Sequence, residues 1–334
     1  MKKYLPVLFL AAATLAVPVR GQVNYGGYVS LDYVRGGGEG DPPGGSVENL
    51  LAGFLAVGQI GQRFGFTLEA RAREVSIFDL EQAWIGFLPS QTVTVKAGLY
   101  LVPFGLYNRA GRPHETPLIG RPLNLESIYP SSWRDLGLVV EGVIGFLSYS
   151  GYLGSGLSGT EGLGSGQQFR DNNTDWAKGG RIGLALGSDV RAGVSYYTGK
   201  HDAEGQRDIV LEAVDLAWVT AQWEVHGEYT KGLIENPEPF EKGRSEGTSI
   251  WMLMGFRGLQ PVGSFQTVKV EDPYLGDAIS QDRRRWTLGL RWVLSPNLFI
   301  KLEYAWNKEE LVLPPEEVFI TKNRVLQVQA ALSF

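Results

Sequence analysis

Cysteine is absent from this chain of 334 residues, and methionine and histidine occur only three times each. Without cysteine there is no disulfide framework, no thiolate metal site, no cysteine nucleophile and no lipoprotein anchor, which needs a cysteine at its cleavage site. The sequence also lacks an HExxH pair, a P-loop and a dinucleotide-binding fingerprint. We therefore expect no cofactor and no metal site. The formal net charge of −5 argues against a nucleic-acid partner.

Long apolar runs are missing except at the amino end, where two lysines precede an apolar run over 5–17. Small residues then lead to a cleavage site before Gln22, which predicts a signal peptide over 1–21 and a mature domain over 22–334. The alternative is an uncleaved anchor, but the run is short for a bilayer crossing of about 20 residues. Since no later run reaches that length, the mature protein is either a soluble exported protein or a β-barrel.

Apolar and polar side chains alternate with a period of two along most of the mature chain, and helical spacing is hard to find. In 64–73, phenylalanine, leucine and alanine occupy one face, while glutamate, threonine and arginine occupy the other. The segments 222–230, 284–294 and 298–306 alternate in the same way. The chain is therefore predicted to be all-β, with two-faced strands.

The expected connections between these strands alternate between short and long. Tight turns are expected near 59–62, 88–91, 143–145, 187–189, 219–222 and 295–297. Long polar connections are expected over 36–45, 101–134, 154–175, 199–206, 232–246, 271–282 and 308–320. Short turns at one end and long loops at the other are typical of a transmembrane antiparallel β-barrel of the outer membrane, here with about 16 strands. A soluble β-sandwich is the alternative, and 263–270 is a weak strand.

The positions of the aromatic residues and the carboxyl end favour the barrel. Tyrosine and tryptophan side chains such as Tyr229, Trp292 and Trp306 lie near segment ends on the apolar face, as interfacial residues do. The chain ends on an alternating strand that closes with Phe334. A terminal phenylalanine of this kind resembles the signal read by the barrel-assembly machinery. Phe334 is thus the expected assembly signal, and the expected partners are that machinery and outer-membrane lipid.

In hydrocarbon every backbone donor and acceptor must be paired, so strands cross a membrane only as a closed barrel. The apolar face then points to lipid and the polar face lines the lumen, which at about 16 strands is wide enough to hold water. The residues expected to line it are basic and acidic in nearly equal number: Arg71, Arg73, Lys96, Arg181, Arg291 and Lys301 against Glu69, Glu141, Glu224, Glu228 and Glu303, with His226 among them.

The connection over 101–134 is rich in proline and arginine and also carries apolar residues that a freely solvated loop would not need. A solvated surface loop is one interpretation. The other is a loop folded into the lumen, which narrows it. In that case the constriction and substrate-binding residues are expected to be Arg109, Arg112, His114, Arg121 and Arg134. Because the planar arginine fork binds oxyanions well, Arg109, Arg112 and Arg121 would favour anions.

Two stretches flanking this loop resemble a known family. The run VKAGLYLVPFGLY over 95–107 is similar to the "G-x-x-x-x-P-F-G" strand end of the phosphate-selective porin O and P family. The run WRDLGLVVEG over 133–142 is similar to that family's "R-D-x-G-x-x-x-x-G" strand, which follows the constriction loop. The resemblance implies a 16-stranded, usually trimeric channel for passive diffusion. The lysine or arginine ladder of phosphate-selective members is missing here.

The sequence therefore predicts an outer-membrane porin for small hydrophilic solutes or ions, with a preference for anions or phosphate and a homotrimeric assembly. We expect no enzymatic activity, because the three histidines carry no recognisable catalytic motif. The alternatives are a barrel enzyme, a structural barrel with a filled interior, or a TonB-dependent barrel. The last would need an amino-terminal plug, whereas 22–60 already alternates as strands do.

Overall fold

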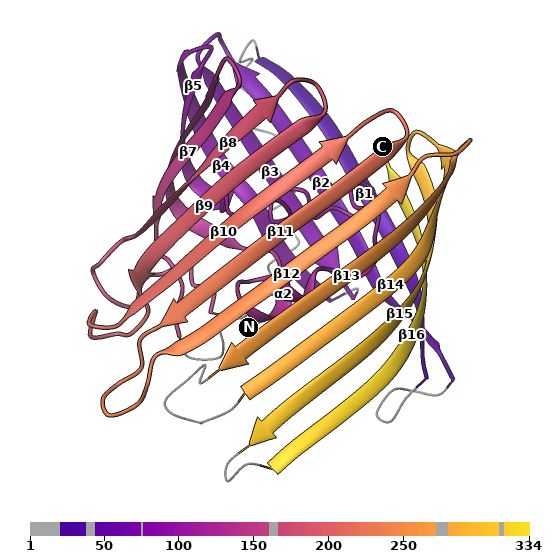
Figure 1. Ribbon diagram of the computed structural model, residues 1–334. Coiled ribbons are helices and arrows are strands. Elements are labelled where there is room, and N and C mark those ends of the chain that lie inside the picture. The colour runs from indigo at the N-terminus through magenta and orange to yellow at the C-terminus, as the bar shows by residue number, and fades with distance from the viewer. Residues whose placement is uncertain (1–20, 38–43, 75, 160–165, 272–279, 314–316) are drawn as a thin grey trace.

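The chain forms a closed antiparallel barrel of sixteen strands in the computed structural model, which describes residues 21–37, 44–74, 76–159, 166–271, 280–313 and 317–334 (Figure 1). Each strand pairs with its neighbours in sequence, and β1 pairs with β16 to close the ring. The predicted fold class is confirmed. Nearly all of the expected signal peptide over 1–21 lies outside the described residues, so that segment stays a prediction.

The strands run in chain order around the ring. Their bounds are β1 Gly21–Gly36, β2 Ser46–Ile60, β3 Phe64–Arg73, β4 Ile77–Ser90, β5 Val93–Leu101, β6 Arg134–Ile144, β7 Leu147–Gly154, β8 Ala177–Leu186, β9 Val190–Lys200, β10 Asp208–Val219, β11 Trp223–Ile234, β12 Gly243–Met254, β13 Leu259–Glu271, β14 Ser280–Ser295, β15 Leu298–Leu313 and β16 Glu317–Ser333. A short helix, α2, covers Leu123–Ser127. In the described part of the chain no helix has the length and apolarity needed to cross a membrane.

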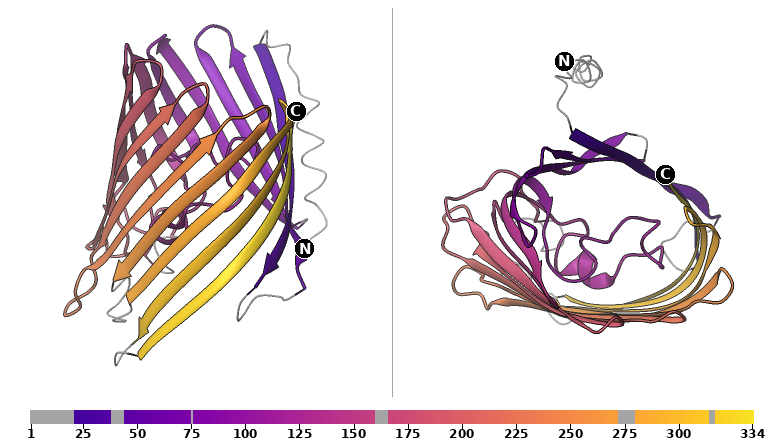
Figure 2. Two further views of the ribbon diagram at one scale, coloured as in Figure 1. Left: turned by 45° about the vertical axis from the view of Figure 1, so that its right-hand side comes forward. Right: turned by 90° about the horizontal axis from the view of Figure 1, so that it is seen from above.

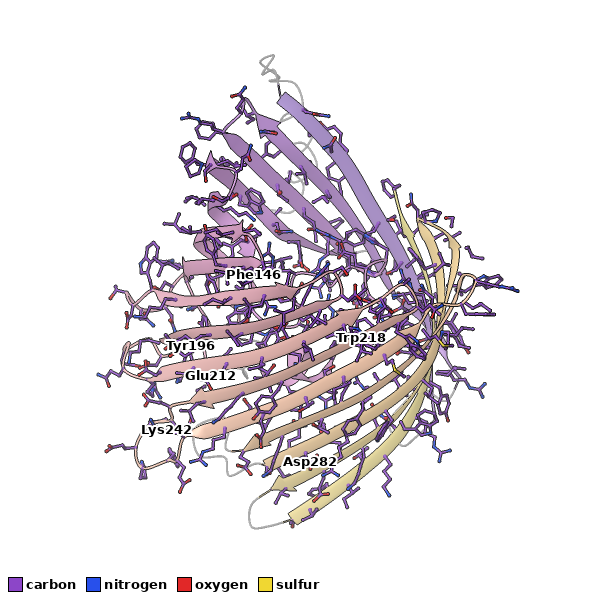
Figure 3. All side chains as sticks on the ribbon, turned by 45° about the horizontal axis from the view of Figure 1, so that its top comes forward. Phe146, Tyr196, Glu212, Trp218, Lys242 and Asp282 are labelled. Carbon is purple, nitrogen blue, oxygen red and sulfur yellow. The ribbon has the colours of Figure 1, made fainter. Side chains whose placement is uncertain are left out.

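The side chains of each strand separate into an outer and an inner set, because successive residues of a strand point to opposite faces of the sheet. On β14, Trp286 and Leu288 are 58% and 61% exposed, whereas Thr287 between them is 4% exposed. On β15 the inward-facing Lys301 is almost fully buried. The outer surface thus carries the exposed apolar side chains, as Figure 3 shows for Phe146, Tyr196 and Trp218. This distribution is the inverse of a soluble barrel.

The tight turns gather at one end of the barrel, where the carboxyl terminus also lies, and the longer connections gather at the other (Figure 1). The weak segment 263–270 is part of the regular strand β13. One expected connection, over 308–320, is wrong in its described parts: 308–313 continue β15 and 317–320 belong to β16, and the two segments pair with each other from Lys308 opposite Lys322 to Leu313 opposite Glu317. The sequence loses its alternation there, but backbone pairing between two adjacent strands does not require it.

Closure of the barrel places the last residue against the first strand. The Phe334 backbone N–H donates to Gly27 O at 2.9 Å, and the Gly27 N–H donates to Phe334 O at 2.9 Å. A Cβ on Gly27 would lie 2.5 Å from the Phe334 ring and 2.8 Å from Gly53 O. Only glycine therefore allows the terminal ring to lie on β1.

This contact predicts that Gly27→Ala weakens barrel closure. We expect overpacking to lower the free energy of unfolding by about 1–3 kcal/mol. The measurement is the temperature of sample heating at which the compact form of the barrel disappears on a gel, which should be lower in the variant. Gly151→Ala is the matched control, because a Cβ on this strand glycine meets no atom within 4 Å. Equal stability of the two variants would show that the Phe334 contact does not contribute to closure.

Candidate pore constriction

The segment over 102–133, between β5 and β6, lies within the ring of strands when the barrel is viewed along its axis (Figure 2). We call it the inner loop. It contains α2 and several side chains that are completely buried, including Phe104, Ile128 and Trp133. A freely solvated surface loop would leave these side chains exposed to water. The apolar residues in this connection therefore have a packing role, as their presence in the sequence indicated.

An aromatic cluster holds the inner loop against one side of the wall. The ring of Trp133 lies 5.4 Å from that of Phe104, 5.9 Å from that of Tyr129 and 4.8 Å from that of Tyr197 on β9. Ile209 and Leu211 on β10 are also fully buried inside the barrel. The expectation of a uniformly polar inner face is therefore wrong on this side, because wall residues covered by the inner loop are shielded from water and can be apolar.

Glu228 on β11 is a buried anchor for the inner loop. Its carboxylate accepts hydrogen bonds from the Leu106 backbone N–H at 2.6 Å, from Asn124 Nδ2 at 2.8 Å and from Tyr129 Oη at 2.7 Å. Gly105 has a φ of +62°, and a Cβ at that position would lie 2.6 Å from Glu228 Oε2. The glycine in the PFG run is thus what lets the chain come so close to this carboxylate.

Lys301 and Glu303 on β15 hold the next part of the inner loop. Lys301 Nζ donates to Pro113 O at 2.6 Å and to Leu118 O at 3.3 Å. Glu303 accepts from the backbone N–H of Ile119 at 2.5 Å and of Gly120 at 3.3 Å. An irregular segment leaves its backbone groups without regular partners, and buried charges need partners too. The charged side chains of the wall and the backbone polar groups of the inner loop are therefore each other's hydrogen-bond partners.

Further wall side chains complete the attachment. On β14, Arg285 donates to Arg121 O at 2.9 Å and Arg291 donates to His114 O at 3.0 Å. On β13, Gln266 accepts from the Leu123 N–H at 3.1 Å. Of the residues predicted to line the lumen, Glu228, Arg291, Lys301 and Glu303 are therefore loop anchors. Their charges act on the inner loop rather than on open water.

Two of the three arginines expected to favour anions are paired with carboxylates. Arg112 donates two hydrogen bonds to Glu69, at 2.9 Å and 2.8 Å, and a third to Glu115 at 2.8 Å. Arg109 lies 3.2 Å from Glu141, which is also paired with Lys96. Close carboxylates cancel much of the field of a guanidinium. The charge that remains for an anion at these two positions is therefore small.

The other predicted residues are distributed around the inner wall. Arg134 begins β6 and donates to Leu80 O at 3.0 Å, so it belongs to the wall and not to the inner loop. Arg181 is paired with Asp215 on β10. His226 lies 2.8 Å from Glu224, and its ring stacks on Trp251 at a centroid distance of 4.0 Å.

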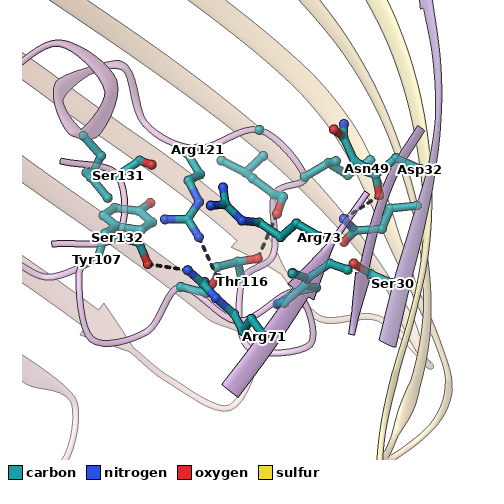
Figure 4. Close-up of a pocket in the computed structure, with 18 of the residues that line it drawn as sticks. Ser30, Asp32, Asn49, Arg71, Arg73, Tyr107, Thr116, Arg121, Ser131 and Ser132 are labelled. Atoms are coloured by element: carbon teal, nitrogen blue, oxygen red, sulfur yellow. Dashed lines mark hydrogen bonds between the residues drawn. The ribbon is translucent and has the colours of Figure 1, made fainter. Parts of the chain in front are cut away.

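A cavity of 240 Å³ separates the inner loop from the wall formed by β1, β2, β3 and β16 (Figure 4). Arg71, Arg73 and Arg121 line it, and so do Asp32 and Gln329. Figure 4 shows Asp32 beside Asn49. Gln329 Nε2 donates to Asp32 at 2.8 Å, whereas Arg71 is paired with Glu81 and donates to Ser132 at 3.0 Å. The cavity thus presents groups of both charges.

The sequence analysis did not predict three residues of this region: Asp32 and Gln329, which line the cavity, and Glu81, which pairs with Arg71. Asp32 and Gln329 alternate with apolar neighbours on the first and last strands, so their parity placed them in the lumen, but only barrel closure brings them together. Glu81 faces inward because β4 has an extra residue opposite the bond between Glu69 and Ala70. Such a β-bulge re-aims side chains, and alternation alone does not reveal it.

No family model matches this chain. Among curated proteins it is similar to an uncharacterized protein of Aquifex aeolicus (strain VF5), with 25% identity over 235 residues, or 64% of this chain. The chain spans about half the length of that relative, 53%.

Solved structures of outer-membrane channels share the fold. An anion-selective porin from Comamonas acidovorans matches with a TM-score of 0.69 and 13% identity, over 94% of this chain and 100% of that one. OmpF of Salmonella typhi matches with a TM-score of 0.65 and 13% identity, over 93% and 97% of the two chains. The outer-membrane channel DcaP of Acinetobacter baumannii matches with a TM-score of 0.65 and 11% identity, over 94% and 97%. At these identities the likeness establishes the barrel fold of porins.

Removing the Glu228 carboxylate should release the inner loop. We expect Glu228→Ala to leave several buried donors without an acceptor, which should lower the free energy of unfolding by about 1–3 kcal/mol for each donor. The loop should then be cleaved by trypsin at Arg112 and Arg121. Limited proteolysis of the folded barrel with mass mapping measures this. Glu224→Ala, four residues earlier on the same inner face, is the control, because Glu224 pairs with His226 and has no hydrogen bond or ion pair to the described residues of the loop. Equal resistance of both variants would contradict the anchor role.

His114 predicts a pH effect on the same segment. Burial lowers the pKa of this imidazole below its usual range, and the nearby charges of Arg112, Lys301 and Arg291 lower it further, while Glu115 opposes them. The folded protein therefore resists a proton that the unfolded chain accepts near pH 6.5, so the free energy of unfolding falls as the pH falls through about 6.5. In detergent, the drop in unfolding temperature from pH 7.5 to 5.5 should be smaller in His114→Gln. An unchanged drop would refute this role.

Proposed function

We propose that this protein is an outer-membrane porin, a water-filled channel for passive diffusion of small hydrophilic solutes. The observation that carries the proposal is a closed barrel with apolar side chains outside and a loop docked inside, which leaves a polar cavity along one wall. Export by a signal peptide over 1–21 and recognition of Phe334 by the barrel-assembly machinery belong to the same proposal.

The solute path would run between the inner loop and the wall of β1, β2, β3 and β16. On the opposite side, the aromatic cluster and buried aliphatic residues fill the space between loop and wall. The cavity is lined by hydroxyl, amide, guanidinium and carboxylate groups, which replace part of the hydration shell of a polar solute. This division of the lumen makes the inner loop the element that sets the width of the channel.

A modest anion preference would come from Arg71, Arg73 and Arg121, which line one side of the cavity. Their field is reduced by Asp32 in the same lining and by the pairing of Arg71 with Glu81 and of Arg73 with Asp79. This balance favours a weakly selective channel over a dedicated phosphate channel. The likeness in sequence to the phosphate-selective porin O and P family supports the loop arrangement more than it supports that family's selectivity.

A homotrimer is the assembly that we propose. OmpT of Vibrio cholerae, a structural neighbour with a TM-score of 0.66 and 10% identity, is described in a trimer form. In a closed trimer of identical chains, one surface patch of each copy contacts a different patch of the next copy, and the contact repeats three times. We propose no catalytic role, because His226 stacks on Trp251 and contacts Glu224 as one member of the polar lining.

Planar bilayer recordings test the channel and its selectivity together. The purified barrel should conduct stably, and a salt gradient should give a reversal potential with a weak anion preference. Arg121→Ala should lower the ratio of anion to cation permeability by roughly fourfold, because a charge about 8–10 Å from the ion in water changes the permeability of each ion by roughly twofold, in opposite directions for the anion and the cation. Arg109→Ala should change it less, because Arg109 is paired with Glu141 and does not line this cavity.

Two outcomes would count against the proposal at different levels. A folded barrel that never conducts would exclude the porin and favour a structural barrel. A conducting barrel in which Arg121→Ala and Arg109→Ala give the same permeability ratio as the unmodified protein would leave the porin in place and exclude the cavity arginines as its selectivity filter.

A further inference from the structure

The outer surface of β14, β15 and β16 carries a row of three cations near the long-loop end of the barrel. Arg284 lies directly opposite Lys308, and Lys308 lies directly opposite Lys322. All three share the outward face with exposed Trp286 and Trp306. Directly opposed side chains on neighbouring strands are about 5 Å apart at Cβ, and like charges placed so repel each other. We call these three residues the basic row. A bound anion would reduce the repulsion between them.

The acids nearby do not balance the basic row. Arg284 lies 2.8 Å from Asp282, and Lys308 lies 3.2 Å from Glu310. Lys322 makes no ion pair with any described residue, and a further outward cation, Arg324, follows it on β16. Four cations thus share this surface with two carboxylates.

A layer of aromatic residues lies directly below the basic row, toward the middle of the barrel. Trp286 is opposite Trp306, and Arg324 is opposite Trp306 on the other side. The next layer contains Leu288, Tyr304 and Leu326, with the Tyr304 ring 4.6 Å from that of Trp306. Tryptophan and tyrosine suit the boundary between hydrocarbon and headgroups. The order of cation, aromatic and aliphatic residues matches the order of phosphate, linker and acyl chain in a lipid.

A second row of charged residues on the outer surface differs from the basic row and shows why an anion site is expected on β14–β16 and not on β10–β13. Across β10 to β13, Glu212, Lys231, Glu246 and Lys269 lie directly opposite one another with alternating charge, and Figure 3 shows Glu212 on this outer surface. There each cation already faces a carboxylate on the neighbouring strand, which makes cross-strand pairing favourable. Among the described strand pairs, cations lie directly opposite cations on β14–β16 alone.

We propose that the basic row binds the phosphate groups of a phosphorylated glycolipid in the outer leaflet, with its acyl chains on the tryptophan layer. Phosphate oxygens between neighbouring strands would accept from two cations at once, which relieves their repulsion. Long loops lie on the outer side of such barrels, so the row faces the outer leaflet. The inference depends on the membrane placement proposed above, but not on channel activity.

The test measures lipid retained by the full barrel in detergent, using native mass spectrometry and titration with an acylated glucosamine disaccharide that carries its phosphates. Lys308→Gln with Lys322→Gln should raise the apparent Kd at least roughly tenfold. Lys231→Gln is the matched control on the alternating row and should bind as the unmodified protein does. The unmodified protein should also bind the phosphatase-treated lipid at least roughly tenfold more weakly, a measurement that needs no variant to fold.

Three results would overturn the proposal. The first is equal affinity of the double variant and Lys231→Gln. The second is equal affinity of the unmodified protein for the lipid with and without phosphate, or for phosphatidylglycerol. The third is a change in oligomeric state of the double variant with lipid affinity unchanged, which would make the basic row a contact between copies of this chain. Each can occur in a barrel that conducts normally, so failure here is distinguishable from failure of the porin.

Discussion

Complete pairing of backbone polar groups is the constraint on which the rest of this structure depends. A strand in hydrocarbon has no water to satisfy its N–H and C=O groups, so the sheet must close, and here β1 meets β16 to remove both edges. Once the ring is closed, each strand has one face toward lipid and one toward the lumen. The apolar exterior, the wet interior and the aromatic layers at the rim all follow from that division.

The inner loop meets the same constraint by a different route. Its backbone is irregular, so its polar groups cannot be satisfied by a ladder and are taken up by wall side chains such as Glu228, Lys301 and Glu303. A charge that binds the loop is no longer available to a permeating ion. The selectivity of the channel therefore depends on the inward-facing charges that do not bind the inner loop, and not on the total number of inward-facing charges.

Pairing of charges within the protein also distinguishes two regions of the outer surface. Where Glu212, Lys231, Glu246 and Lys269 alternate, the sheet balances its own charges across neighbouring strands. Where Arg284, Lys308 and Lys322 meet, it does not. At this rim, the excess of cations over carboxylates is the feature that points to a partner outside the protein.

The sequence by itself determined the barrel, because the alternation of side chains with a period of two is a local property that each strand carries independently. It also placed Lys301, Glu303 and Glu228 on the inner face by parity. Only the tertiary structure decided what these groups contact: Lys301 and Pro113 are 188 residues apart, and their meeting depends on how the ring closes around the loop. Pairing between strands likewise decided the bulge that turns Glu81 inward and the continuation of β15 over 308–313 and of β16 over 317–320, and no single segment encodes that pairing.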